Sequence, residues 1–107
     1  MSVFSISDIR VENWDKYEEY VAKTRGIVES YGGKYHVRGG KITVNAGDWQ
    51  PNRLIVIEFP SLEDMAKFRE APEYQPVAAI RKSASTMISN ITVEGYDGET
   101  DNIGGAG

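Results

Sequence analysis

The side chains best suited to binding an anion or moving a proton lie on two predicted strands, at residues 34–38 and 53–59. Successive strand side chains point to opposite faces, so His36 and Arg38 are expected on the same face. An imidazole titrates near neutral pH, and a guanidinium binds a carboxylate or phosphate through its planar fork. We therefore predict His36 as a catalytic proton carrier, Arg38 as a ligand-binding residue, and Glu58 as the carboxylate that orients one of them.

A purely structural role accounts for the same three residues. Arg38 and Glu58 are also suited to a partly buried ion pair in which each satisfies the other. A single histidine on a strand is commonly a hydrogen-bonded core or surface residue. At this stage both interpretations stay open, because the pattern does not say which sheet face would line a cavity.

Further candidates for ligand binding come from a loop and a helix. Trp49 lies among turn residues, where it would either close over a cavity mouth or pack at an edge or against a partner subunit, since aromatic residues are enriched at interfaces. Tyr74 and Arg81 are seven residues apart, which is two helical turns, so they share a helix face. Arg81 is equally suited to anchoring its helix to an acidic residue such as Glu58.

The last strand adds Asn90 as a ligand-binding candidate, and the first strand places Ser5 and Ser7 on one face. Polar groups of this kind in an apolar concave lining are the general form of a small-molecule site. The chain has one histidine and no cysteine, which excludes thiolate and multi-histidine metal sites, and we expect no metal and no cofactor.

The elements that must position these residues follow from periodicity and capping signals. Asn13 is an N-cap for a helix that ends at Gly32-Gly33, and Ser61 with Asp64 resembles a capping box. Ala71-Pro72 is expected to interrupt the second helix. The predicted elements are a strand over 2–11, a helix over 14–31, a strand over 34–38 extended by 42–44, a strand over 53–59, helical segments over 62–70 and 73–82, and a strand over 86–94.

This order is β-α-β-β-α-β, an α+β, ferredoxin-like arrangement in which helices cover one face of a four-stranded antiparallel sheet. The strand at 53–59 is apolar on both faces, so the face without helices needs a second layer, most simply another copy of the chain. We therefore predict a homodimer that pairs through its sheets. On the last strand, alternation divides the side chains into two sets: Met87, Ser89, Ile91 and Val93, and Ile88, Asn90, Thr92 and Glu94.

Length and composition set further limits. With 107 residues the chain is predicted to form one domain at 1–95, followed by a flexible, glycine-rich acidic tail at 96–107. A net charge of −4 argues against nucleic-acid binding, and no apolar run approaches the length of a membrane span. No secretory signal is recognisable, so we expect a cytoplasmic location.

Several motifs, taken in order, resemble the family called domain of unknown function 1330, over about residues 3–95. They are Tyr31-Gly32-Gly33, Arg38-Gly39-Gly40, Gly47-x-Trp49, the run from Arg53 to Ser61, and Pro72-x-Tyr74-Gln75 with Arg81. The resemblance implies a dimeric α+β barrel, a group that includes cofactor-independent monooxygenases, muconolactone-isomerase-like enzymes and stress-response proteins. It implies no reaction and no catalytic residue.

The sequence thus favours a homodimer that binds a small, anionic organic molecule in a cavity either between sheet and helices or at the sheet interface. Whether it is a cofactor-independent enzyme is left open. The alternative is a non-enzymatic stress-response or interaction protein whose polar cluster is structural. A cavity with unpaired polar groups would favour the first, and a packed interface with Arg38 and Glu58 satisfied by each other would favour the second.

Overall fold

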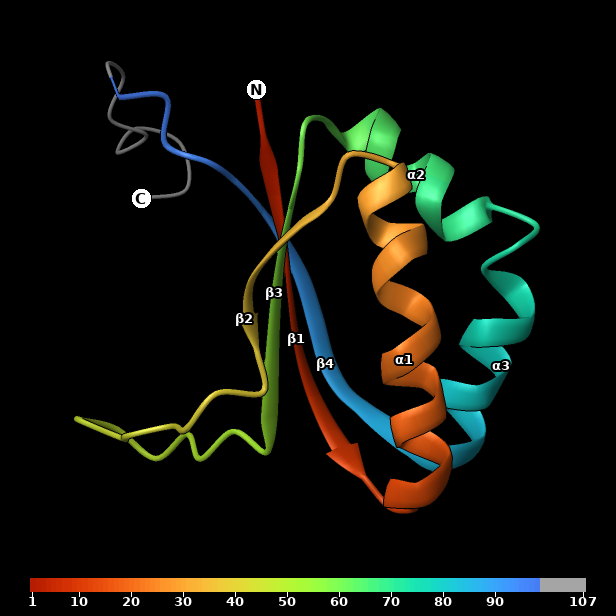
Figure 1. The fold of residues 1–107 in the computed structure, drawn as a ribbon. Helices are drawn as coiled ribbons and strands as arrows, with labels where there is room; N and C mark the ends of the chain where they lie inside the picture. Colours follow the sequence, from red (N-terminus) through yellow and green to blue (C-terminus); the bar gives the residue numbers. More distant parts are fainter. Residues whose placement is uncertain (99–107) are drawn as a thin grey trace.

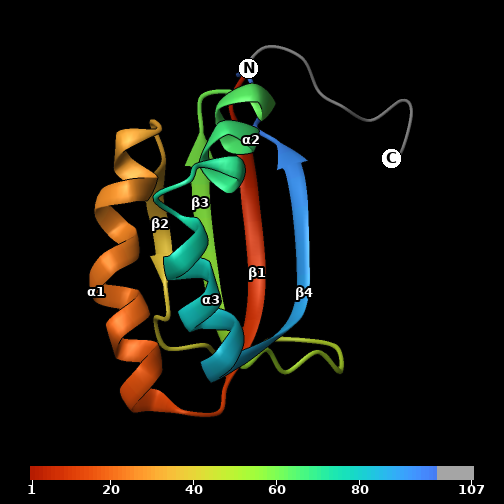
Figure 2. The same ribbon diagram turned by 90° about the vertical axis from the view of Figure 1, so that its right-hand side faces the viewer.

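The computed structural model describes residues 1–98. Its four strands form a single antiparallel sheet in the order β2-β3-β1-β4. The three helices lie on one side of it (Figure 1), and the sheet is seen behind them in Figure 2. The predicted α+β, ferredoxin-like fold is confirmed. The elements are β1 (Val3–Val11), α1 (Trp14–Ser30), β2 (Lys34–Arg38), β3 (Arg53–Phe59), α2 (Leu62–Glu70), α3 (Gln75–Ala84) and β4 (Ser85–Glu94).

The helix boundaries follow the predicted capping residues. Asn13 accepts a hydrogen bond from the backbone N–H of Lys16 at 3.2 Å, and Ser61 Oγ accepts one from the N–H of Asp64 at 3.0 Å. Each bond satisfies a backbone donor that has no partner inside the first helical turn. After α1 the chain turns at Gly32, whose φ of 84° lies in the left-handed region that glycine adopts readily.

The core lies between the helices and the covered face of the sheet. Phe59 is 1% exposed, and its ring centre lies 5.5 Å from that of Phe68 in α2. Val28 of α1 and Val3 of β1 belong to the same buried cluster, together with Tyr74 at the start of α3. These contacts fix the spacing between helices and sheet near the α2 end, where burial of large apolar side chains stabilises the fold.

A bulge in β2 changes the predicted faces of its side chains. Tyr35 pairs with Ile57 and Val37 with Val56, so His36 is the extra residue between two paired positions. His36 and Val37 therefore both face away from the helices, whereas Arg38, opposite Ile55, faces them. The prediction that His36 and Arg38 share a face was wrong, because strict alternation does not hold through a bulge.

A second bulge lies in β4 beside the C-terminal part of β1. Asp8 pairs with Ser89 and Ile9 with Met87, which leaves Ile88 without a partner residue on β1. Met87 therefore shares the helix-covered face with Asn90, contrary to the alternation predicted from sequence. The bulge brings a flexible apolar side chain next to the polar groups of the covered face.

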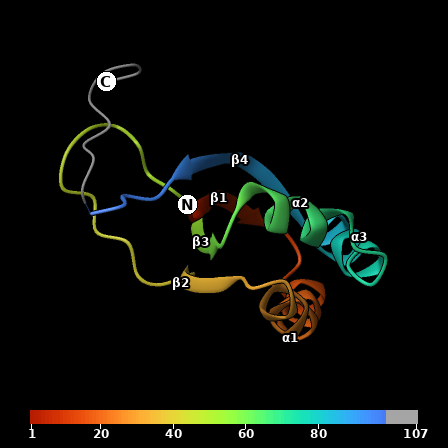
Figure 3. The same cartoon turned by 90° about the horizontal axis from the view of Figure 1, so that it is seen from above.

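The loop at residues 39–52 extends from the side of the sheet opposite the helices (Figure 1; Figure 3). The predicted continuation of the strand over 42–44 was wrong, because these residues have no ladder partner among residues 1–98. The buried carboxylate of Asp8 holds the end of this loop, accepting from the N–H of Asn52 at 2.9 Å and from Trp49 Nε1 at 3.4 Å. At its start, Gly39 has a φ of 76°, and a Cβ there would collide with the guanidinium of Arg53.

The sheet ends where the N–H of Gly95 donates to the carbonyl of Ser2 at 2.9 Å. The predicted tail at 96–107 falls mostly on residues 99–107, which lie outside the described residues, so the division at residue 95 stays a prediction. None of the helices within residues 1–98 combines the length and hydropathy that crossing a bilayer requires.

Candidate functional site

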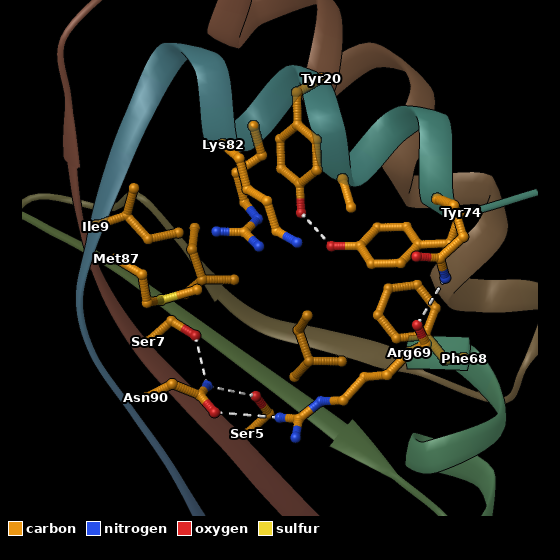
Figure 4. Close-up of a pocket in the computed structure, with 15 residues that line it drawn as sticks. Ser5, Ser7, Ile9, Tyr20, Phe68, Arg69, Tyr74, Lys82, Met87 and Asn90 are labelled. Carbon is orange, nitrogen blue, oxygen red and sulfur yellow. Dashed lines mark hydrogen bonds between the residues drawn. The ribbon is translucent and has the colours of Figure 1, made fainter. Parts of the chain in front are cut away.

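A cavity of about 300 Å³ lies between the covered face of the sheet and the helices. β1 contributes Ser5 and Ser7 to its floor, and β4 contributes Asn90 (Figure 4). Isoleucines of β3 and Phe68 of α2 supply apolar walls. The size and the mixture of apolar walls with a few polar groups match small-molecule sites in general.

A hydrogen-bonded cluster occupies the sheet side of the cavity (Figure 4). The amide nitrogen of Asn90 donates to Ser7 Oγ at 2.8 Å and to Ser5 Oγ at 3.1 Å, while Arg69 Nη2 donates to the Asn90 amide oxygen at 3.1 Å. The arginine fixes which way the amide points, since only its oxygen can accept. Both serine oxygens serve as acceptors here, so their O–H groups are available to donate to a further group.

A pair of tyrosines lies on the helix side of the cavity. The hydroxyls of Tyr20 and Tyr74 are 3.2 Å apart and face the serine and asparagine cluster across the cavity (Figure 4). Burial, followed by the neighbouring Tyr74, raises the pKa of Tyr20 well above its ordinary value, so Tyr20 keeps its proton. Two hydroxyls carry two protons and one bond between them uses one, which leaves an O–H group free to donate.

Three cationic side chains complete the lining: Arg69 from α2, and Arg81 and Lys82 from the last turn of α3. Within residues 1–98, the side chains of Arg81 and Lys82 form no ion pair or hydrogen bond. The described part of the chain places no aspartate or glutamate in the cavity lining. The polar groups that face the cavity are therefore mainly hydrogen-bond donors, and the positive charges among them lack a counter-charge.

The sequence-predicted site residues fall into three places. Tyr74, Arg81 and Asn90 line the cavity between sheet and helices. His36 and Arg38 border a second, more open hollow of about 560 Å³ that the start of the 39–52 loop also lines. Glu58 and Trp49 line neither the main cavity nor this second hollow, and their surroundings are described next.

The expected ion pair between Arg38 and Glu58 was wrong, because the β2 bulge puts them on opposite faces of the sheet. Arg38 Nη2 donates to the carbonyl of Val21 in α1 at 2.6 Å, and its guanidinium lies 4.5 Å from the centre of the Tyr35 ring. These contacts tie β2 to α1. Burial raises the pKa of Tyr35, an effect that the charge of Arg38 opposes.

Glu58 is paired instead with His36 on the open face. His36 Nε2 lies 2.8 Å from Glu58 Oε1, and this hydrogen bond, followed by one from Ser2, lowers the pKa of Glu58. Because an ionised carboxylate only accepts hydrogen bonds, Nε2 carries the proton. The ring of Phe4 lies 5.4 Å from the imidazole. The predicted proton carrier thus lies outside the cavity, and the indole of Trp49 is held by Asp8 rather than over the cavity mouth.

Several residues that line the cavity were not predicted from the sequence: Tyr20, Arg69, Gln75 and Lys82. Tyr20 extends the predicted apolar stripe of α1, since it lies three residues after Tyr17 and four before Thr24. That spacing could have identified Tyr20 as a residue that faces the sheet. Arg69 gave no comparable signal, because it reaches the sheet from the exposed side of a short helix.

A family model for a domain of unknown function (DUF1330) matches residues 2–96. The chain belongs to this family. The predicted membership is confirmed. Among curated proteins, none matches the chain.

Solved structures share the fold at low sequence identity. A protein of unknown function, RPA0582 from Rhodopseudomonas palustris, is 16% identical with a TM-score of 0.70, over 89% of this chain and 82% of that one. SnoaB from Streptomyces nogalater, a cofactor-independent oxygenase, is 14% identical with a TM-score of 0.61, over 89% and 93%. A dimeric ferredoxin-like protein of unknown function from Thermobifida fusca is 12% identical with a TM-score of 0.51, over 87% and 88%. These likenesses establish the fold.

Proposed function

We propose that this protein is a homodimer that binds a small anionic organic molecule in the cavity between the sheet and the helices. The observation that carries the proposal is the composition of the lining: three cationic side chains, several free hydroxyl donors, and no carboxylate among the residues described. A cation that lacks a counter-charge in a partly enclosed site favours an anion, because charge-assisted hydrogen bonds are about twice as strong as neutral ones. The apolar walls favour an organic body over a bare inorganic ion.

The open face of the sheet supports the homodimer. Ile91 is 57% exposed and Val93 is 47% exposed, and they adjoin the half-buried Phe4, Ile6 and Val56 on the neighbouring strands. A contiguous apolar surface of this kind commonly marks an interaction site. A similarly folded neighbour is described as dimeric. A second copy of this chain is the partner we propose, and a cytoplasmic location stays a prediction.

A cofactor-independent enzyme is the second candidate. The Tyr20–Tyr74 pair, which offers a protonated hydroxyl beside cationic groups, is suited to stabilising an oxyanion in the cavity. SnoaB, which shares the fold, is a cofactor-independent oxygenase. His36 is a weaker catalytic candidate than the sequence suggested, because it faces away from this cavity and is paired with Glu58.

Calorimetric titration with 2-naphthoate and its neutral analogue 2-naphthamide tests the binding proposal. The acid should bind, and the amide should bind at least about tenfold more weakly, since it lacks the negative charge that would pair with the cationic side chains. Arg81→Gln should weaken binding of the acid about tenfold. Lys67→Gln is the matched control, because Lys67 is exposed on α2 and paired with Glu63 at 3.3 Å.

Two outcomes would overturn the proposal. If acid and amide bind equally well, the cations do not select the ligand. If neither binds, the polar groups of the cavity are structural, which supports the alternative of a non-enzymatic interaction protein. Sedimentation velocity of the purified protein tests the homodimer separately, and a monomer at high micromolar concentration would contradict it.

A further inference from the structure

The residues that carry the cationic side chains of the cavity lie near the two ends of α3. Arg69 lies beside its first turn, where Gln75 Nε2 donates to the Arg69 carbonyl at 2.9 Å. Arg81 and Lys82 lie in its last turn. Gln75 and Arg81 are six positions apart, which corresponds to about 9 Å along a helix that rises 1.5 Å per residue. The backbone positions that carry the positive charges are therefore distributed along the cavity instead of being gathered at one point.

The residues on the sheet side of the cavity are likewise arranged along its length. Arg69 reaches Asn90, which contacts Ser5 and Ser7, whereas Met87 and its partner Ile9 lie further along the strands. Figure 4 shows Lys82, Ile9 and Met87 toward one side of the cavity and Arg69, Phe68 and Tyr74 toward the other. From that side, the side chain of Arg69 reaches across the floor of the cavity to Asn90 (Figure 4).

The stretch between the two cationic ends is apolar. Ile55, Ile57 and Ala78 line it, and Ile55 and Ala78 are buried within the chain. The free hydroxyl donors flank this stretch, with the serines on the sheet and the tyrosine pair on the helices. A ligand that matches the lining needs an apolar middle and a hydrogen-bond acceptor at each end.

We infer that the ligand carries two anionic groups, such as carboxylates, at opposite ends of an apolar body, because the cations lie at both ends of the apolar stretch. One anionic group binds Arg69 and the serine hydroxyls, and the other binds Arg81 and Lys82. The inference rests on the proposed function and adds the class of ligand. It competes with a simpler role for Arg81 and Lys82, since basic residues in the last turn of a helix also complement its dipole.

The test compares matched monoanions and dianions by calorimetric titration. One pair is 2-naphthoate and naphthalene-2,6-dicarboxylate, and a smaller pair is benzoate and terephthalate. In at least one pair the dianion should bind about tenfold more tightly, the size expected for one added charge-assisted interaction. Arg69→Gln should remove this advantage, Arg69→Lys should keep part of it, and Lys67→Gln should leave it unchanged.

The outcomes separate this inference from the proposed function. If the monoanions bind and the dianions bind no better, the two-ended ligand is excluded while the anion site stands. The same conclusion follows if the dianion keeps its full advantage in both Arg69→Gln and Arg81→Gln. If no member of either pair binds, both the inference and the proposed function are overturned. The melting temperature of each variant, measured without ligand, shows that its fold is intact.

Discussion

The polar groups on the two sides of the sheet differ in whether they have partners within the chain. On the open face, Glu58 is bonded to His36, and the carboxylate of Asp8 accepts hydrogen bonds from the 39–52 loop. On the helix-covered side, Arg81 and Lys82 of α3 line the cavity, and their side chains have no hydrogen-bond or ion-pair partner among residues 1–98. Charges that a protein satisfies within its own chain contribute to its fold, whereas charges left unsatisfied beside a cavity are available to a ligand.

The apolar groups show the reverse arrangement. Those of the covered face are packed against helices, while Ile91 and Val93 on the open face lie in solvent. Each face is thus incomplete in one respect. The cavity over the covered face has no carboxylate among its lining residues within 1–98, and a small molecule would supply one, whereas the open face lacks an apolar layer, which a second copy of the chain would supply.

The largest difference between the faces should appear when one β3 residue from each face is truncated. Phe59→Ala should lower the free energy of unfolding by about 3 to 5 kcal/mol, because a fully buried ring leaves a cavity. Val56→Ala, on the opposite face and only half-buried, should cost about 1 kcal/mol. Denaturant unfolding measures both. Equal losses would show that Val56 is buried as completely as Phe59 in the associated protein.

The next effect concerns assembly. Ile91→Asp places a charge in the open face and should shift the protein from dimer to monomer, weakening association at least about tenfold, since the charge would have to be buried in the dimer. Leu62→Asp is a matched control, because Leu62 on α2 is 58% exposed and Ile91 is 57% exposed. Sedimentation velocity gives the molecular mass. If Ile91→Asp remains a dimer, the interface does not include the open face around Ile91.

The loop on the open face should depend on one buried carboxylate. Asp8→Ala removes the buried carboxylate that accepts from the N–H of Asn52 and should lower stability by about 1 to 3 kcal/mol, the range for hydrogen bonds to a charged group. Quenching of Trp49 fluorescence should increase in the variant as the loop loosens. Glu63→Ala, an exposed carboxylate on α2, should change stability by less than about 0.5 kcal/mol. A similar small change for Asp8→Ala would mean that the loop is held by other contacts.

The smallest effect should be a pH dependence from the pair on the open face. Since the pKa of Glu58 is lower in the folded than in the unfolded protein, the pair stabilises the fold above the ordinary glutamate pKa of about 4.3. This contribution is lost as the pH falls through the lowered folded value. The melting temperature of Glu58→Gln should lie below that of the wild type near about pH 6 and converge with it in stronger acid.

The exposed Glu18→Gln is the control for this titration, because it changes the same type of residue without a paired histidine. A melting-temperature difference for Glu58→Gln that stays constant down to strong acid would refute the linkage. It would mean that the substitution acts through packing instead of through the ionised carboxylate.

Element positions could be predicted from the sequence because local interactions determine them. The caps at Asn13 and Ser61, the turn at Gly32 and the break at Ala71-Pro72 all lie where their chemistry requires. The faces of individual side chains could be predicted only where the strands are regular. Ser5 and Ser7 obey the alternation of β1 and line the cavity as a pair.

The bulges at His36 and Ile88 explain most of what the sequence did not predict about the site. Each inserts one residue into a ladder, and each reverses the faces of the residues on one side of it. No glycine or proline marks either position. As a result the predicted cluster of His36, Arg38 and Glu58 divides between two faces. The cationic lining depends on long side chains whose direction is set by tertiary packing.

The most direct test of the account is to locate the bound anion by nuclear magnetic resonance. Titration of isotope-labelled protein with 2-naphthoate should shift the amide signals of the covered face, including Ser5, Ser7 and Asn90, and those at the start of α3. The signals of His36 and Val37 on the open face should move little. Shifts concentrated at His36 and Val37 would contradict the account, because they would place the anion site on the open face.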